Sequence, residues 1–252
     1  KGKEPPVAPA SAGVSCFWEG AMQIWAGLGN PGPQYAKHRH NVGFMALDAI
    51  AAWHDFPTWR KRFQGWTCEG KLDGEKVVLL KPATFMNESG QSAQEAVRFY
   101  KLELDDVIVF HDELDLAPGK VRVKTGGGVA GHNGLKSMST HLGNDYVRVR
   151  IGIGHPGRKD QVSGYVLRNF PKADYLWLEK LIGAIAAEAA YLARGENDKF
   201  QSRVAYVMQG EDEPGAEAKP ELAPKPSRAK SQKPAKHEGA LANMLRRWLG
   251  SS

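Results

Sequence analysis

Met22-Gln23-Ile24-Trp25-Ala26-Gly27-Leu28-Gly29-Asn30-Pro31-Gly32-Pro33 decides the fold class, because an apolar run leads directly into a turn rich in glycine and proline. The apolar part has the length and composition of a buried strand, and the residues after it stop that strand. The same order of apolar run, polar turn and helical spacing recurs along the chain. Further strands are expected at residues 77–80, 107–110, 120–124 and 147–153. Helices are expected at residues 42–54, 89–101, 134–142 and 175–194.

One turn adds an antiparallel element to this alternation. Leu72-Asp73-Gly74-Glu75 places a two-residue Asp-Gly turn between strand-like flanks, which predicts a β-hairpin. Strands that alternate with helices predict an α/β fold: a single three-layer domain with a mixed, mostly parallel twisted sheet flanked by helices. In such sheets, binding sites form in the loops beyond the carboxyl ends of the strands. The polar motifs at those loops are therefore the candidate functional residues.

Composition narrows the class of protein. The chain has 252 residues and a formal net charge of +6, which favours an acidic partner such as nucleic acid. Two cysteines, Cys16 and Cys68, form no C-x-x-C pair, which excludes a disulfide framework and a cysteine zinc site. No apolar run is long enough to span a bilayer, and the N-terminus lacks the apolar segment of a signal peptide. We expect a cytoplasmic protein that does not enter a membrane.

The two ends differ in composition from the middle of the chain. Residues 1–21 are rich in Pro, Ala, Ser and Gly and predict a flexible leader. Residues 22–210 contain the strand and helix patterns and predict the folded domain. Residues 211–239 are a Pro/Ala/Lys-rich stretch that predicts a disordered linker, because such a segment buries too little apolar surface. Apolar residues at helical spacing predict a short amphipathic helix at residues 240–252.

The turn after the first strand also matches the glycine pattern of dinucleotide-binding proteins. That reading is disfavoured because Pro31 and Pro33 lack the backbone N–H groups that would hold a pyrophosphate. Asp48 lies inside a helical pattern, whereas the acidic residue of such proteins follows a second strand. A tight glycine turn remains the alternative. The turn also displays the Asn30 amide, which no turn geometry requires.

A histidine-rich segment precedes the first helix. In Lys37-His38-Arg39-His40-Asn41, Asn41 is a candidate N-cap, which puts His40 at the positive end of the helix. That position favours a neutral ring, which can accept a proton near neutral pH. The alternative is that both histidines are ordinary surface residues of a loop.

Two further motifs follow expected strands. In Thr84-Phe85-Met86-Asn87-Glu88-Ser89, Asn87 or Ser89 could cap a helix, or the apolar pair Phe85-Met86 could form the wall of a binding cleft. In Phe110-His111-Asp112-Glu113-Leu114-Asp115, titratable groups directly follow an apolar strand. A carboxylate at that place can orient a catalytic histidine. A metal site is the competing interpretation, but no tight ligand spacing supports it.

The last two motifs lie in the second half of the chain. Lys124-Thr125-Gly126-Gly127-Gly128 begins a glycine run that could contact a ligand with its backbone or move as a flap. His132 and Asn133 precede a helix, so Asn133 is a candidate cap. Arg148 and Arg150 alternate on a strand, which puts both guanidinium groups on one face. That face could meet phosphates or could simply be solvated.

Covalent catalysis is unsupported. No G-x-S-x-G elbow occurs, and neither cysteine has a partner histidine in a recognised motif. Histidine, carboxylates and side-chain amides at loop ends remain. That set suits activation of water by a general base.

Taken in register, these motifs resemble the bacterial peptidyl-tRNA hydrolase family. The resemblance rests on Gly-Leu-Gly-Asn-Pro-Gly (27–32), Arg-His-Asn (39–41), Thr-Phe-Met-Asn (84–87), His-Asp-Glu-Leu-Asp (111–115) and Gly-His-Asn-Gly-Leu (131–135). It covers residue 22 to about residue 209. His38 departs from the pattern, because the family usually has threonine there.

The resemblance implies the activity and the roles of the residues. The family frees tRNA for reuse in translation, and in ribosome rescue, by cutting the ester between tRNA and its peptide. His40 would be the base that activates water, and Asp112 would orient it. The implied substrate-binding and supporting residues are Asn30, Tyr35, Asn41, Met86, Asn87, His132 and Asn133. Lys124 and Arg150 would contact tRNA phosphates. A monomer is expected, and neither a metal nor an organic cofactor is implied.

Two other classes of protein stay open on the residues alone. A nicotinamide-linked oxidoreductase would bind a dinucleotide saturably. A non-enzymatic RNA-binding module would bind tRNA but leave the ester-linked peptide intact.

Overall fold

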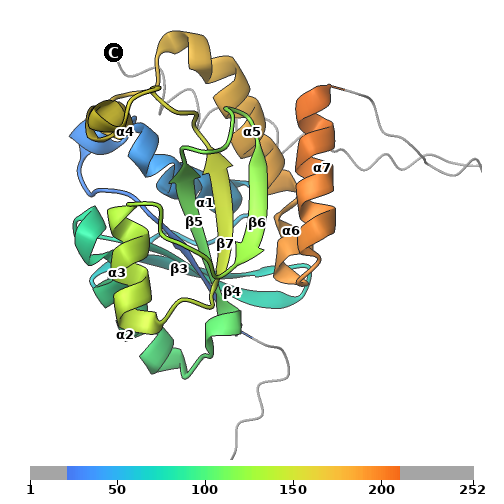
Figure 1. The fold of residues 1–252 in the computed structure, drawn as a ribbon. Helices are drawn as coiled ribbons and strands as arrows, with labels where there is room; N and C mark the ends of the chain where they lie inside the picture. The colour runs from blue at the N-terminus through green and yellow to red at the C-terminus, as the bar shows by residue number, and fades with distance from the viewer. Residues whose placement is uncertain (1–21, 211–252) are drawn as a thin grey trace, which may run out of the picture.

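A computed structural model describes residues 22–210, which form one sheet with helices on both faces (Figure 1). The strand order is β2-β3-β4-β1-β5-β7-β6. The strands are β1 (Met22–Gly27), β2 (Arg60–Arg62), β3 (Gly65–Leu72), β4 (Glu75–Pro82), β5 (Val107–Glu113), β6 (Val121–Thr125) and β7 (Val147–Gly152). The central strands β4, β1, β5 and β7 are parallel, and β3 and β6 run against their neighbours. The expected α/β class with a mixed, mostly parallel sheet is confirmed.

The helices cover the two faces of the sheet and bury a separate apolar cluster on each. One face carries α1 (Val42–Trp53), α5 (Tyr175–Ala187), α6 (Ala189–Ala193) and α7 (Asn197–Gln209). The other carries α2 (Ser89–Tyr100) and α3 (Asn133–Leu142). A single turn, α4 (Val162–Val166), lies near the start of α1. Within residues 22–210, no helix is long and apolar enough to cross a membrane. The expected leader, linker and C-terminal helix, at residues 1–21, 211–239 and 240–252, lie outside the described residues.

The predicted hairpin is confirmed. Leu72 of β3 pairs with Glu75 of β4, so only Asp73 and Gly74 form the turn. Their φ angles are 50° and 92°, in the left-handed region that Asp-Gly tolerates at a two-residue turn. The hairpin thus adds the antiparallel strand β3 beside the parallel strand β4.

Some elements differ from the sequence prediction. The helix expected at residues 175–194 is broken at Glu188, where the side chain turns to Arg203 of α7. Strand β2 was not predicted, because the three residues Arg-Lys-Arg are exposed and carry no apolar alternation. Helices α4 and α7 were also missed. The first is one turn long, and the second buries only Phe200 and Val204, too few apolar positions to give a helical pattern.

The start of α1 lies directly against the sheet. A Cβ atom on Gly43 would be 2.3 Å from the carbonyl oxygen of Phe110 and 2.6 Å from the backbone nitrogen of Leu28, so glycine is required there. Leu28 in turn donates a backbone hydrogen bond to Phe110 over 2.9 Å. This close approach holds the residues just before α1 beside the carboxyl end of β5.

Candidate active site

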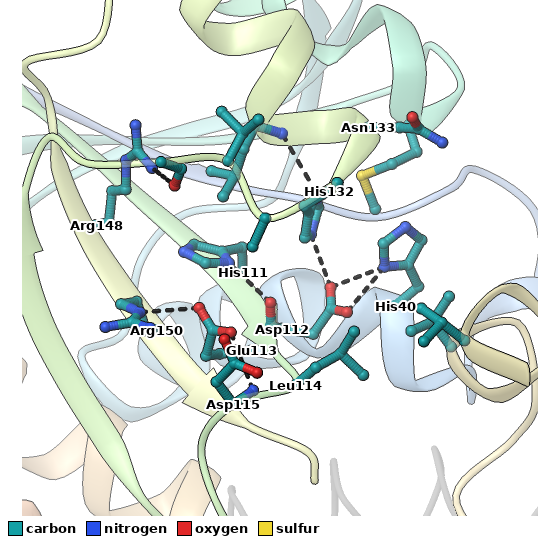
Figure 2. A pocket seen from close by; sticks show the side chains of 18 of the residues that line it. His40, His111, Asp112, Glu113, Leu114, Asp115, His132, Asn133, Arg148 and Arg150 are labelled. Atoms are coloured by element: carbon teal, nitrogen blue, oxygen red, sulfur yellow. Dashed lines mark hydrogen bonds and ion pairs between the residues drawn. The ribbon is translucent and has the colours of Figure 1, made fainter. Parts of the chain in front are cut away.

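A cavity of about 740 Å³ lies beyond the carboxyl ends of β1, β5 and β7 (Figure 2). This is the edge of the sheet where binding sites of α/β proteins form. Residues from separate segments of the sequence meet in its wall, among them Asn30, His40, Met86, Asp112, His132 and Arg150. The polar motifs of the sequence therefore converge here.

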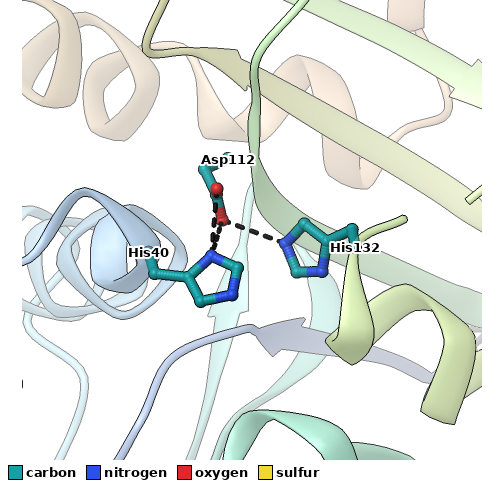
Figure 3. Close-up of side chains that lie close together, drawn as sticks. All are labelled: His40, Asp112 and His132. Carbon is teal, nitrogen blue, oxygen red and sulfur yellow. Dashed lines mark hydrogen bonds and ion pairs between the residues drawn. The ribbon is translucent and has the colours of Figure 1, made fainter. Parts of the chain in front are cut away.

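His40 and Asp112 form the centre of the cavity (Figure 3). The Nδ1 atom of His40 lies 2.8 and 3.0 Å from the two carboxylate oxygens of Asp112. Both residues are buried, with 8% and 3% of their surface exposed. Because an ionised carboxylate only accepts hydrogen bonds, Nδ1 carries the hydrogen and Nε2 of His40 keeps its lone pair.

A second histidine contacts the same carboxylate. The Nε2 atom of His132 lies 2.9 Å from Oδ1 of Asp112, and its ring lies 4.7 Å from that of His40. Its Nδ1 atom accepts hydrogen bonds from the backbone amides of Gly134 and Leu135, at 3.1 and 3.3 Å. An accepting Nδ1 carries no hydrogen, so the neutral ring is fixed with its hydrogen on Nε2. His132, and not Asn133, therefore caps α3.

Burial and hydrogen bonding shift the pKa values of this pair in opposite directions. Burial alone would raise the pKa of Asp112, but the two histidines that donate to it hold that pKa well below its ordinary value. Burial alone would lower the pKa of His40, but the charge and hydrogen bond of Asp112 raise it above 6.5. The influence of Asp112 therefore exceeds that of burial, and it acts against the neutral ring that a position at a helix start favours.

His40, Asp112 and His132 could also be read as metal ligands, because one ligand atom from each lies within 4.8 Å of the others. The hydrogen bonds among these three side chains offer another explanation of why they lie together. The two nitrogens that face Asp112 both carry hydrogens in the neutral rings, and these hydrogens satisfy the carboxylate. The arrangement of the three groups is thus explained without a cation.

Arg39 fixes the segment that carries His40. Its guanidinium donates to the carbonyl oxygen of Asn169 over 3.1 Å and lies 4.2 Å from the ring centre of Tyr165. It also forms an ion pair of 3.7 Å with Asp174. The single 3₁₀ turn Arg39–Asn41 is thereby attached to the region around α4. Sequence patterns could not show this role, because the partners lie more than a hundred residues away.

Asn41 holds Asn30 in place. Asn41 occupies the N-cap position of α1, as expected, but its side chain makes no capping hydrogen bond. Its amide instead accepts from the backbone N–H of Asn30 over 3.0 Å and donates to the carbonyl of Asn30 over 2.9 Å. The side-chain oxygen of Asn30 accepts from the backbone N–H of Met86 over 2.9 Å. The Asn30 amide nitrogen is the atom left to donate into the cavity.

The remaining residues that the resemblance assigned to the substrate fall into two groups. Asn87 and Asn133 are exposed and line the cavity together with buried Met86. Neither Asn87 nor Ser89 caps α2, because the helix begins without a side-chain cap. Tyr35 does not reach the cavity wall, and its ring packs edge-on against His38 at 5.3 Å.

Basic side chains gather beside this cavity on one face of β6 and β7. Lys124 pairs across the strands with Arg148, and Arg122 pairs with Arg150, so all four point to the same face. Arg148 is buried and donates to the carbonyl of Gly128 over 2.8 Å, so it holds the glycine run. Arg122 was missed, although it alternates with Lys124 just as Arg148 does with Arg150.

His111 was also missed as a site residue. It is fully enclosed and packs edge-on against His132, with ring centres 5.3 Å apart. Burial first, and then the positive groups around it, lowers its pKa to about 3, so the ring is neutral. Its Nδ1 atom donates to the backbone carbonyl of Asp112 over 2.8 Å, which helps to fix the strand end.

The fold and the site together define a class of protein: an α/β protein in which a buried carboxylate at a strand end orients a histidine beside a cavity. No side chain in this arrangement is placed as a nucleophile for a covalent intermediate. Amide donors line the same cavity, where a carbonyl group could be bound.

Comparison with known proteins gives the family. The family model described as peptidyl-tRNA hydrolase matches residues 24–212. The peptidyl-tRNA hydrolase of Novosphingobium aromaticivorans is 64% identical over 188 residues, which is 75% of this chain and 98% of that protein. That of Rhizorhabdus wittichii is 64% identical over 187 residues, covering 74% and 99%. The crystal structure of peptidyl-tRNA hydrolase from Acinetobacter baumannii is 38% identical with a TM-score of 0.69, covering 73% of this chain and 94% of that one. This chain belongs to the peptidyl-tRNA hydrolase family.

Proposed function

We propose that this protein hydrolyses the ester bond between a peptide and tRNA, with water activated by His40. The observation that carries the proposal is the fixed hydrogen bond from Nδ1 of His40 to Asp112, because it leaves the other ring nitrogen available as a base. Family membership supplies the substrate.

The reaction needs only water and the side chains described. Nε2 of His40 removes a proton as water attacks the ester carbonyl carbon, and the imidazolium that forms is stabilised by Asp112. The carbonyl oxygen becomes negatively charged, and the amide nitrogen of Asn30, whose oxygen is held by Met86, donates to it. When the intermediate collapses, the carbon–oxygen bond to the ribose breaks and His40 returns the proton to the ribose oxygen. The products are a free peptide acid and tRNA. No step requires a cofactor.

The basic face of β6 and β7 supports binding of the tRNA backbone. Lys124 and Arg150 line the cavity, and Arg122 extends the same face to the edge of the sheet. Arg150 forms an ion pair of 2.9 Å with Glu113, which orients its guanidinium. Phosphates would contact this face while the esterified end of the tRNA enters the cavity.

The proposal also covers the setting in which the enzyme works. His40, Asp112, His132 and Asn30 all come from one chain, which supports action as a monomer. Peptidyl-tRNA arises where ribosomes work, which supports a cytoplasmic location.

The test uses N-acetylaminoacyl-tRNA as the substrate and free aminoacyl-tRNA as the control for the blocked amine. We expect rapid release of tRNA from the first, and a loss of about 100-fold or more in His40→Ala, the size expected for removing a general base. His54→Ala is the matched control, because His54 lies at the opposite end of α1 and bonds to Ala186. His54→Ala should retain turnover within about threefold, a change of under 1 kcal/mol. Near-normal turnover by His40→Ala would end the assignment of His40 as the base.

A further inference from the structure

A second cavity of about 310 Å³ lies beside the first and shares Asn30 with it. Its wall comes from the turn after β1, the start of α1 and the ends of β3 and β4. We propose that this cavity binds an apolar side chain of the substrate peptide, on the residue that precedes the esterified one. The inference rests on the proposed function and assigns a second binding position to the same substrate.

Asn30 forms the boundary between the two cavities. Its backbone is held on both sides by the amide of Asn41, and its side chain is fixed by the backbone of Met86. Asn41 itself lines the second cavity. A peptide whose ester carbonyl lies at the Asn30 amide is therefore beside this opening as it continues toward its N-terminus. The boundary is rigid, so the distance between the two positions is fixed.

The wall of the second cavity is mainly apolar. Phe44, Met45 and Trp66 contribute large side chains, together with two prolines of the turn after β1 and the proline that ends β4. Trp66 is 40% exposed, so part of a large apolar ring is open to solvent. The Phe44 ring packs tightly on the turn, since a Cβ atom on Gly29 would be 2.8 Å from it. These surfaces favour an apolar occupant.

The charges in this wall cancel each other. Lys81 forms an ion pair with Asp48, and its ammonium lies 4.1 Å from the ring centre of Trp59. Both charged side chains are at most partly exposed, at 15% and 29%. Neither is left to attract a charged ligand, so the pair favours an uncharged side chain. The volume lies at the lower end of the roughly 300–1,000 Å³ typical of ligand sites, which suits one or two residues.

The test compares two substrates that differ only in the residue before the esterified one. N-acetyl-Leu-X-tRNA and N-acetyl-Gly-X-tRNA carry the same esterified residue X. We expect the wild-type kcat/KM to be about tenfold higher for the leucine substrate, the size expected for burying most of a leucine side chain. Binding is measured in parallel with amide-linked analogues, in which nitrogen replaces the ester oxygen. The binding measurement tests the second cavity independently of hydrolysis. A leucine preference in binding without any turnover would overturn the hydrolase mechanism and leave the proposal for the second cavity standing.

Two variants locate the preference in the second cavity. Trp66→Ala removes an apolar wall, and Ala36→Leu fills the space, since Ala36 also lines it. Each should bring the ratio of leucine to glycine substrate close to one in both kcat/KM and binding. Phe99→Ala is the matched control, because Phe99 is an exposed aromatic residue of α2 that lines neither cavity. It should keep the wild-type ratio.

Three results would overturn the proposal. The first is a wild-type enzyme with equal kcat/KM and equal affinity for the two peptides. The second is a leucine preference that persists in both Trp66→Ala and Ala36→Leu. The third is an equal loss of affinity for both peptides in Trp66→Ala, which would show that Trp66 contacts the RNA.

Discussion

Asp112 links two histidines whose roles differ because their second ring nitrogens meet different groups. The second nitrogen of His132 is occupied by two backbone amides of α3, so this ring is a fixed part of the structure. The second nitrogen of His40 faces the cavity, so this ring can exchange a proton with a ligand. One carboxylate thus orients the ring of His40, while the ring of His132 holds the carboxylate from the other side.

The charge of Asp112 should be visible in the pH profile. The base must be neutral, and the pKa of His40 is raised above 6.5, so kcat/KM should fall as the pH drops through a value above 6.5. Asp112→Asn removes the charge that raises this pKa but leaves the burial that lowers it. The acid limb should therefore move to lower pH, while the maximal rate falls by about 10²–10⁴-fold because the ring is no longer held correctly.

The comparison needs a carboxylate variant outside the cavity. Asp105→Asn serves, because Asp105 is exposed and precedes β5. Its pH profile should match that of the wild type. An acid limb that stays in place in Asp112→Asn would mean that another group controls the profile.

At the scale of elements, the position of α1 decides whether the site forms. The helix start approaches the backbone of β1 and β5 at Gly43, and Arg39 attaches the preceding turn to the region around α4. His40 lies between these two attachments. Its distance from Asp112 therefore depends on the backbone packing at Gly43 and on the contacts of Arg39.

Gly43→Ala tests this dependence. Alanine favours a helix by about 1 kcal/mol over glycine, but the added methyl group would lie within 2.3 Å of a backbone oxygen. Overpacking of this kind costs about 1–3 kcal/mol, so we expect a lower midpoint of urea unfolding and a loss of turnover from the displaced His40. Gly164→Ala is the matched control, because a Cβ atom there meets nothing within 4 Å. It should be neutral or slightly stabilising, and equal stability of the two variants would contradict the packing argument.

An element could be predicted where the residues that determine it are adjacent in the sequence, and was missed where contacts with other segments determine it. The hairpin at Asp73-Gly74 is set by two adjacent residues, and the strands by continuous apolar runs, so both were readable from the sequence. Strand β2 exists because β3 offers it a partner, and α7 because the sheet edge receives its two buried side chains. Neither cause leaves a pattern in the segment itself.

The site shows the same limit at finer detail. The sequence placed polar residues at the correct strand ends, and the resemblance paired His40 with Asp112. The sequence could not show which of two neighbouring polar residues caps α3. Asn133 was the expected cap, whereas His132 performs that role. The sequence also could not show that Asn41 acts on Asn30 or that Arg148 is buried under the glycine run, because both depend on contacts between distant segments.

For the whole molecule, the distribution of charge predicts how binding responds to salt. Arg148 and Arg150 already have partners within the protein, whereas Arg122 and Lys124 form no ion pair in the part of the chain that the structure describes. These two are therefore the side chains of the basic face most available to phosphates. Each phosphate contact contributes somewhat less than one unit to the slope of log K against log salt concentration.

The salt slope of tRNA binding should fall by slightly less than one unit in Lys124→Ala and by nearly twice that in the double variant with Arg122→Ala. Binding titrations between about 50 and 200 mM salt would measure it. Lys71→Ala is the control, because Lys71 is an exposed cation on the hairpin at the other side of the sheet. A weaker affinity with an unchanged slope would mean that Lys124 acts through the shape of the glycine run.

The ring of His132 also turns two amides of α3 into built-in probes of the pair His40–Asp112. The ¹H and ¹⁵N resonances of Gly134 and Leu135 report the electron density on the nitrogen to which they donate, and that nitrogen belongs to the ring that donates to Asp112. Any ligand that alters the charge or hydrogen bonding of the carboxylate should shift both signals together. In a uniformly labelled sample, two cross-peaks would then record binding at this pair, with no dye, no label on the RNA and no turnover.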